Sequence, residues 1–191
     1  NYTATAGDVR LDGYQTYGIL NATAGDDISI GWELNATTAT LTAGDDVSIR
    51  GTTRFGDLTV NATDDISIRG DQQTTGTATL NAGDNISLRD NNSFGALDAL
   101  AGTSIYSHGI LSVTNDGNLS AGDDIHLHGN NSFGGELNAL AGDDVHLHGL
   151  LNVTGDGNLS AGDDIHLHGN NSFGGDLNAD AGDDIHSHGL L

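Results

Sequence analysis

The chain repeats itself, and this repetition constrains its fold more than any other feature of the sequence. The segment GNLSAGDDIHLHGNNSFGG runs from Gly117 to Gly135 and occurs again, unchanged, from Gly157 to Gly175. A shorter motif, Ala-Gly-Asp-Asp-Ile-x-Leu with variants, recurs along the whole chain. Its alanine falls at Ala6, Ala24, Ala43, Ala62, Ala82, Ala101, Ala121, Ala141, Ala161 and Ala181. These units of mostly 19 or 20 residues fill residues 1–191, which predicts a single domain without a linker.

Each unit has the pattern of short β-strands separated by turns. In the segment 125–129, Ile and Leu alternate with His, which is the period of a half-buried strand. The segment 118–121 alternates in the same way, and Gly122-Asp123-Asp124 between the two segments has the composition of a turn. With a third short strand, each unit contains about three strands and three turns. No segment has the 3.6-residue spacing of an amphipathic helix, and the protein is therefore expected to be all-β.

A unit of 20 residues cannot bury its own apolar face, but stacked units can bury a shared one. We therefore predict a parallel β-helix (β-solenoid) of triangular section, with about ten coils forming a rod roughly 50 Å long. Core residues support the stacking: Leu137 and Ala139 in one coil correspond to Gly157 and Leu159 in the next. Large residues then lie over small ones, and the coils of the C-terminal half pair into 40-residue repeats. A β-sandwich would not keep one motif in register ten times.

Composition limits the partners that the protein can bind. There are 27 acidic residues against five Arg and no Lys, so the formal charge is −22. Such a field repels nucleic acid and anionic lipid, and it attracts cations. The chain contains no Cys, no apolar run long enough to span a membrane and no signal peptide. It opens on Asn1 without an initiator Met, as expected of a mature or excised segment.

Several segments resemble a known family of bacterial proteins. TLTAGDDVSIRG (40–51), TLNAGDNISL (79–88) and NLSAGDDIHLHG (118–129) are similar to repeats of the filamentous-haemagglutinin-like exoproteins of two-partner secretion. The resemblance implies a right-handed β-helix that forms a rigid extracellular stalk or adhesive surface. The absence of Lys and the paired histidines depart from that family. A weaker likeness to the calcium-binding nonapeptides of repeat-in-toxin proteins fails on spacing, because those motifs recur every nine residues.

Stacking in register places the turn aspartates in ladders along one edge of the rod. Neighbouring carboxylates then lie about 5 Å apart and repel one another. Hydrogen bonds to the backbone two residues on would offset part of this repulsion, and oxygen-rich turns also suit Ca²⁺. The candidate calcium ligands are Asp123, Asp124, Asp143, Asp144, Asp163, Asp164, Asp183 and Asp184. We expect Asn85 and Thr103-Ser104 to interrupt the ladder.

The histidines form a second array. Since Ile125 and Leu127 face inward, His126 and His128 face outward, and the same holds in the following coils. The candidate ligands for Zn²⁺, Cu²⁺ or Ni²⁺ are His126, His128, His146, His148, His166, His168, His186 and His188. The alternative is a pH-responsive surface, because His becomes charged near pH 6.

Asn-x-Ser/Thr motifs predict sites for glycans if the chain is secreted by a glycosylating host. The candidate sites are Asn21, Asn118, Asn130, Asn158 and Asn170.

The sequence favours a structural, non-catalytic protein that requires no cofactor. We expect the stalk of a secreted bacterial exoprotein, located at the cell surface, which contacts a receptor or glycan on a host or neighbouring cell. The alternative is a subunit that stacks head to tail into an extracellular filament and binds metal ions through its ladders. Enzymes on β-helices, such as polysaccharide lyases, use grooves with long loops that this chain lacks. Ice-binding solenoids carry stacked Thr-x-Thr ladders, whereas Thr38/Thr40 and Thr77/Thr79 look isolated here.

Overall fold

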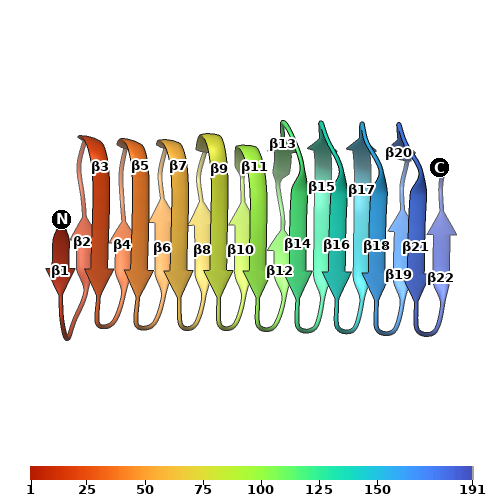
Figure 1. Cartoon of the computed structure of the whole chain (residues 1–191), viewed down its shortest axis with the longest axis horizontal. Helices are drawn as coiled ribbons and strands as arrows, with labels where there is room; N and C mark the ends of the chain where they lie inside the picture. Colours follow the sequence, from red (N-terminus) through yellow and green to blue (C-terminus); the bar gives the residue numbers. More distant parts are fainter. Residues whose placement is uncertain (191) are drawn as a thin grey trace.

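The structure, a computed structural model, describes residues 1–190 and forms a β-solenoid. All of its strands pair in parallel with the equivalent strand one coil away, and residues 1–190 contain no helix. Figure 1 shows the strands side by side along the long axis, with the N-terminus at one end and the C-terminus at the other. The coils stack in about nine turns. The ten copies of the motif, from Ala6 to Ala181, enclose nine intervals of one turn each.

Each coil contributes to three faces, which we name in chain order after the Gly-Asp-Asp turn. The first face contains β2 (Val9–Leu11), β4 (Ile28–Ile30), β6 (Val47–Arg50), β8 (Ile66–Arg69), β10 (Ile86–Arg89), β12 (Ile105–Ser107), the start of β15 (Ile125–Phe133) and of β17 (Val145–Val153), β19 (Ile165–His168) and β22 (Ile185–His188). The second face contains β13 (Ile110–Val113), β20 (Asn171–Phe173) and the ends of β15 and β17.

The third face leads into the next Gly-Asp-Asp turn. It contains β1 (Tyr2–Ala4), β14 (Gly117–Ala121), β16 (Leu137–Ala141), β18 (Gly157–Ala161) and β21 (Leu177–Ala181). In the N-terminal half, single long strands cover the second and third faces together: β3 (Gln15–Ala24), β5 (Leu34–Ala43), β7 (Thr53–Ala62), β9 (Gln72–Ala82) and β11 (Asn91–Ala101). The expected three strands per coil are therefore merged into two there.

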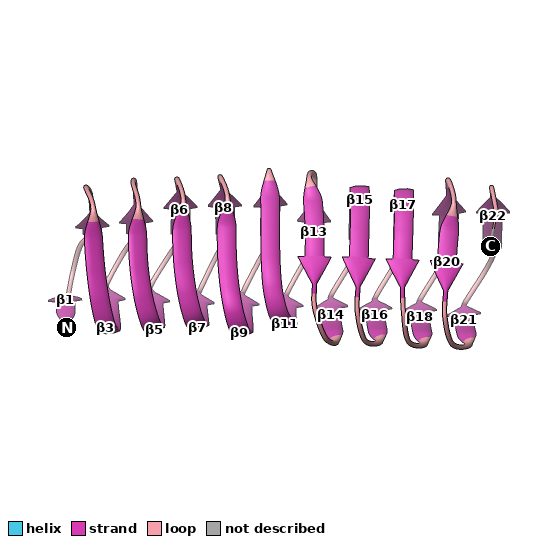
Figure 2. Ribbon diagram, turned by 90° about the horizontal axis from the view of Figure 1, so that it is seen from above, coloured by secondary structure: helices cyan, strands magenta, loops and turns pink. Residues whose placement is uncertain are grey.

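The two halves differ in which corner the strand continues through. In the C-terminal half, Gly134-Gly135 and Gly155-Asp156 form turns that separate the second face from the third. In the N-terminal half the strand continues through this corner, although glycines stand there in most coils: Gly18, Gly56, Gly76 and Gly95. In β15 and β17 the strand continues instead through the preceding corner, where Gly129 has a φ of 88° that a side chain would disfavour. Figure 2 shows this change from one long strand per coil to separate strands near β13.

The core is a column of apolar side chains along the axis. On the first face Ile125 and Leu127 are buried, and their equivalents in other coils lie directly above and below them. On the third face Leu119 pairs with Ala139, and Gly117 pairs with Leu137. The predicted alternation of large and small residues is therefore confirmed.

The same alternation extends into the N-terminal half, beyond the 40-residue repeats that the sequence shows. Ala39 and Leu41 pair with Leu20 and Ala22, and Ala78 and Leu80 pair with Leu97 and Ala99. Two coils are thus the packing unit over most of the rod.

Candidate functional site

The eight predicted histidines all lie on the first face and point outward. Strand geometry determines this, because Ile125 and Leu127 of the same strand are at most 1% exposed and occupy the inward positions. The strands pair in register, so the histidines form two columns, as predicted. One column contains His126, His146, His166 and His186, and the other contains His128, His148, His168 and His188.

The imidazole rings are stacked nearly parallel. The centroids of His126 and His146 lie 4.6 Å apart with an angle of 4° between the rings, and His148 and His168 lie 4.9 Å apart at 5°. Tyr106 and His108 extend the two columns by one coil toward the N-terminus, with Tyr106 5.0 Å from His126. These separations are typical of favourable aromatic stacking. Stacking at this distance is favourable between uncharged rings, because two neighbouring imidazolium ions would repel one another.

Each histidine of the first column lies beside the second aspartate of the preceding turn. His146 Nε2 is 3.4 Å from Asp144 Oδ2, and His126 Nε2 is 3.6 Å from Asp124 Oδ2. The same contact occurs at His166 and His186, at 3.7 Å in each case. Protonation of a histidine in this column would therefore bring its charge next to a carboxylate.

The other oxygen of the same carboxylate binds the backbone of the next coil. The amide of Asp164 donates to Asp144 Oδ1 at 2.9 Å, and the amide of Asp144 donates to Asp124 Oδ1 at 3.2 Å. We expected these carboxylates to bind their own turn, two residues on. They bind the equivalent residue one coil later instead, because stacking places its amide directly in front of the carboxylate.

The column of negative charge is interrupted at Asn85 and Ser104, but the hydrogen-bond ladder continues through both residues. Asn85 accepts from the amide of Ser104 at 3.3 Å, and Ser104 Oγ accepts from the amide of Asp124 at 3.4 Å. The expectation that Asn85 and Thr103-Ser104 break the ladder is therefore correct for charge and wrong for hydrogen bonding. Amide and hydroxyl oxygens accept hydrogen bonds as carboxylates do.

The first aspartate of each turn is exposed and forms a separate column. It includes Asp123, Asp143, Asp163 and Asp183 in the C-terminal half. The pKa values of Asp64 and Asp143 are raised because the adjoining coils remove part of their hydration, and because neighbouring aspartates add negative charge. The column therefore has an electrostatic cost that protons or cations reduce.

Burial has the opposite effect on histidine, because it disfavours the charged form. It lowers the pKa of His126, where the charge of His146 adds to the effect and Asp124 opposes it. Burial also lowers the pKa values of His128 and His148, each with a contribution from neighbouring histidines. At these three positions the first face therefore favours the neutral imidazole.

The ring geometry bears on the predicted transition-metal site. A tetrahedral zinc site needs ligand atoms that converge on one point, whereas these rings lie parallel. Within residues 1–190, no group of three or more His, Cys, Asp or Glu side chains is placed to hold a metal ion. Binding of Zn²⁺, Cu²⁺ or Ni²⁺ stays a prediction that requires the rings to leave their stacked positions. Calcium binding by the turn aspartates also stays a prediction.

The predicted glycan sites fall into two groups. Asn130 and Asn170 are exposed at the corner after the first face. Asn118 and Asn158 lie on the third face, where their amides donate to Asp98 and Asn138 at 2.7 and 2.8 Å. Asn21 similarly donates to Asn1 at 3.2 Å. A glycan on one of these three nitrogens would compete with that hydrogen bond, so Asn130 and Asn170 are the most accessible of the set.

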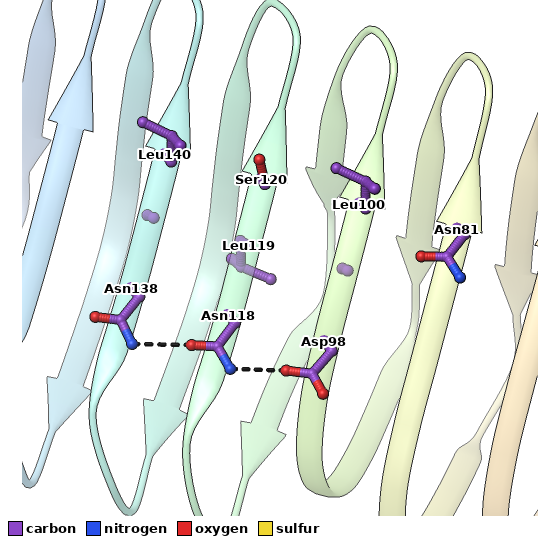
Figure 3. Close-up of a pocket in the computed structure, with 10 residues that line it drawn as sticks. Asn81, Asp98, Leu100, Asn118, Leu119, Ser120, Asn138 and Leu140 are labelled. Atoms are coloured by element: carbon purple, nitrogen blue, oxygen red, sulfur yellow. Dashed lines mark hydrogen bonds between the residues drawn. The ribbon is translucent and has the colours of Figure 1, made fainter.

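Sequence reasoning missed the most regular feature of the third face. Asparagine amides form a ladder here, in which Asn138 donates to Asn118 at 2.9 Å and Asn178 donates to Asn158 at 2.9 Å (Figure 3 shows part of it). Beside the ladder lies a shallow depression of about 370 Å³ between Leu100 and Leu140. The 20-residue spacing of these asparagines was the available signal.

The threonines of the N-terminal half also form columns on the third face. Thr40 pairs with Thr59 and Thr59 pairs with Thr79, while Thr23 pairs with Thr42. The pairs Thr38/Thr40 and Thr77/Thr79 do not stack on further Thr-x-Thr pairs, as expected, because Thr38 pairs with Asp57 and Thr77 pairs with Ala96. The single column of Thr40, Thr59 and Thr79 was not anticipated, because only pairs were compared.

Comparisons with known proteins identify a repeat family. A family model described as repeats of unknown function (DUF5649) matches residues 36–97, 93–139 and 129–180. These three matches span most of the chain. No curated protein and no solved structure matches the chain. No helix long and apolar enough to cross a membrane is present in residues 1–190.

Proposed function

This chain belongs to the DUF5649 family of repeats, and from that premise we propose that it is a structural and adhesive extracellular rod. In this proposal it forms the repeat stalk of a secreted bacterial surface exoprotein of the filamentous-haemagglutinin-like kind. Its role is to hold a binding surface at a distance from the cell. The proposal assigns no catalysis to the chain.

The observation that supports this role is the continuous register of the coils. Each coil of residues 1–190 pairs with the next on the first and third faces, from Val9 with Ile28 to Ile165 with Ile185. Short turns connect the strands, and the side chains of Asp124 and Asn138 add further bonds between coils. A chain built in this way resists bending and presents the same chemistry at regular intervals of about 4.8 Å.

Localisation and adhesion together test the proposal. Antibodies raised against the purified chain are expected to label the surface of intact cells of the source organism by immunogold microscopy. Beads coated with the chain are expected to attach to neighbouring or host cells, whereas beads coated with a compact protein of equal negative charge do not. Labelling confined to the cell interior would exclude the surface role, and equal attachment of both kinds of bead would exclude specific adhesion.

A second candidate function is a filament subunit that stacks end to end. At the C-terminal end of the described residues, β20, β21 and β22 each pair with a strand on one side only, and Ile185 is 50% exposed. Either further coils of the same chain or a second copy would cover this surface.

Negative-stain microscopy of concentrated protein distinguishes these two possibilities. Filament formation predicts long unbranched fibres that Ile185→Asp abolishes. Ile110→Asp is the matched control, because Ile110 is 48% exposed on the side of the rod and its substitution would leave end-to-end stacking intact. Persistent monomers at all concentrations would favour the stalk.

A further inference from the structure

Charge is almost absent from the outward positions of the third face. Its two columns contain Asn21, Thr40, Thr59, Thr79, Asp98, Asn118, Asn138, Asn158 and Asn178, and Thr23, Thr42, Asn61, Asn81, Leu100, Ser120, Leu140, Ser160 and Asp180. Only Asp98 and Asp180 among them are charged, although the chain carries a net charge of −22. The acidic residues are therefore concentrated on the other faces and the turns. A surface of this composition favours an uncharged partner.

The centre of this face combines an apolar patch with a row of polar groups. Leu100 and Leu140 are 53% and 54% exposed, and Ser120 lies between them in the intervening coil. Figure 3 shows the two leucines on one side of the depression and the ladder of Asp98, Asn118 and Asn138 on the other. An exposed leucine is ordinary by itself, but these two border one depression and together form a small apolar patch on an otherwise polar face.

The asparagine ladder leaves hydrogen-bonding capacity free for a ligand. Asn118 uses one amide hydrogen for Asp98 and accepts one bond from Asn138. A primary amide has two donor hydrogens and an oxygen with two lone pairs, so each ladder asparagine retains a donor and an acceptor. The ladder bonds also hold the amides in fixed positions, which reduces the entropy that binding would cost.

We propose that the third face between Asn81 and Leu140 binds an extended, neutral polysaccharide that lies along the rod. This inference rests on the proposed adhesive function and specifies its partner. Sugar rings combine apolar C–H faces, which would pack on the leucines, with hydroxyl groups, which would bond to the asparagines. The leucines recur every second coil, roughly 10 Å apart. In an extended β-1,4-linked glycan, alternate sugars present the same face, so the polymer has a matching two-unit repeat.

Retention of the purified full chain on insoluble polysaccharides tests this proposal. The probes are cellulose, chitin and mannan as neutral polymers, with cross-linked polygalacturonate as the charged comparison. We expect binding to at least one neutral polymer and none to polygalacturonate. The double variant Leu100→Asp/Leu140→Asp is expected to lower that affinity by at least about tenfold, because it adds charge and removes apolar contact.

Leu150→Asp is the matched control, because Leu150 is 49% exposed but lies in β17, away from the third face. It introduces the same Leu→Asp change at one position, so its direct counterpart is the single variant Leu100→Asp, and it is expected to leave binding unaltered, with unchanged circular dichroism in every variant. The proposal is overturned if no neutral polymer is retained, if polygalacturonate is preferred, or if Leu150→Asp weakens binding equally. Altered ice-crystal growth without glycan retention would reassign the face to ice. None of these outcomes changes the rod shape or the surface labelling that test the proposed function.

Discussion

A turn aspartate such as Asp144 makes two separate interactions through its two oxygens. Oδ1 accepts the amide of Asp164, and Oδ2 lies beside His146 Nε2. Asn85 and Ser104 make the first interaction without a negative charge. The hydrogen bond is therefore the structural requirement at this position, and the charge is an addition that brings repulsion within the column.

Substitutions at Asp144 separate the two contributions. Asp144→Asn keeps an acceptor for the amide of Asp164, as Asn85 does, and we expect stability within about 0.5 kcal/mol of the parent. Asp144→Ala removes the acceptor and is expected to destabilise the protein by about 1–2 kcal/mol. Urea unfolding followed by circular dichroism measures both. An equal loss for the two variants would show that the charge, and not the hydrogen bond, stabilises the turn.

The histidine stack predicts how stability depends on pH. Burial lowers the pKa values of His126, His128 and His148 below the ordinary value of 6.5. Well above pH 6.5 these residues are neutral in both the folded and the unfolded state, and no stability is lost to their protonation. As the pH falls, these histidines take up protons more readily in the unfolded chain than in the folded chain. The free energy of unfolding therefore decreases as the pH falls from the ordinary pKa to the lowered pKa values of the folded state. The expected result is a urea midpoint that decreases from about pH 7.5 to about pH 5.

The raised pKa values of Asp64 and Asp143 act in the opposite direction. Their folded forms bind protons more readily than the unfolded chain, so their contribution is present at low pH and is lost as the pH rises above the ordinary value of 3.8. Part of the lost stability should therefore return near pH 4.

The control for the histidine prediction replaces His126, His128 and His148 with Ser, the residue that the first column has at Ser48. A midpoint that still falls between about pH 7.5 and pH 5 in that variant would contradict the assignment to histidine.

At the scale of the elements, a large side chain from the second face of one coil packs beside a glycine on the third face of the preceding coil. Gly117 lies at the start of β14, and the ring of Phe133 from the next coil occupies the volume where its side chain would be. Gly157 and Phe173 repeat the arrangement one coil pair later. Strand pairing therefore places a large residue beside each of these glycines, and the two kinds of coil are complementary in shape.

A double-mutant cycle at Gly117 and Phe133 measures this complementarity. Gly117→Ala places a methyl group on the ring and is expected to cost about 1–3 kcal/mol. Phe133→Leu alone creates a cavity, and the double variant should be more stable than the sum of the single effects predicts. Thermal unfolding provides the values. Gly18→Ala is the control, because its methyl group would contact nothing within 4 Å, and it is expected to be neutral or slightly stabilising.

The strands and their inward residues could be predicted from the sequence, because Ile125 and Leu127 alternate with polar residues at the period of a strand. The merging of two strands into one, as in β5 and β7, could not, because it depends on how the corner at Thr37-Thr38 bends. Similarly, outward placement of the histidines follows from alternation. Their parallel rings and the bonds of Asp144 to another coil depend on the distance between coils, which no local pattern specifies.

At the scale of the whole molecule, the alternation of coils predicts which deletions the rod tolerates. Removal of residues 117–156 brings Leu97 beside Gly157 in place of Gly117, so large residues still lie over small ones. Removal of residues 117–136 brings Leu97 beside Leu137 and Ala99 beside Ala139, which overfills one layer and leaves space in another. The two-coil deletion should keep cooperative unfolding and shorten the rod, whereas the one-coil deletion should unfold at lower temperature.

Calorimetry and small-angle X-ray scattering check this prediction. The two-coil deletion is expected to shorten the longest dimension by roughly 10 Å, twice the spacing between strands. The one-coil deletion removes fewer residues than the two-coil deletion. If it is nevertheless the less stable of the two, the amount of core removed cannot be the reason. If it proved the more stable of the two, the pair of coils would not be the packing unit.

The two side-chain ladders also give the rod a direction. In both of them the donor belongs to the later coil and the acceptor to the earlier one, as for Asp164 with Asp144 and Asn158 with Asn138. The backbone bonds between coils run in both directions, but a cross-section through these two ladders leaves oxygen acceptors on one side of the cut and N–H donors on the other. Two copies that meet end to end continue these two ladders only in one orientation, since the reverse orientation sets oxygen against oxygen in them. Whatever these coils assemble into inherits that polarity, and its two tips are chemically distinct starting points for growth.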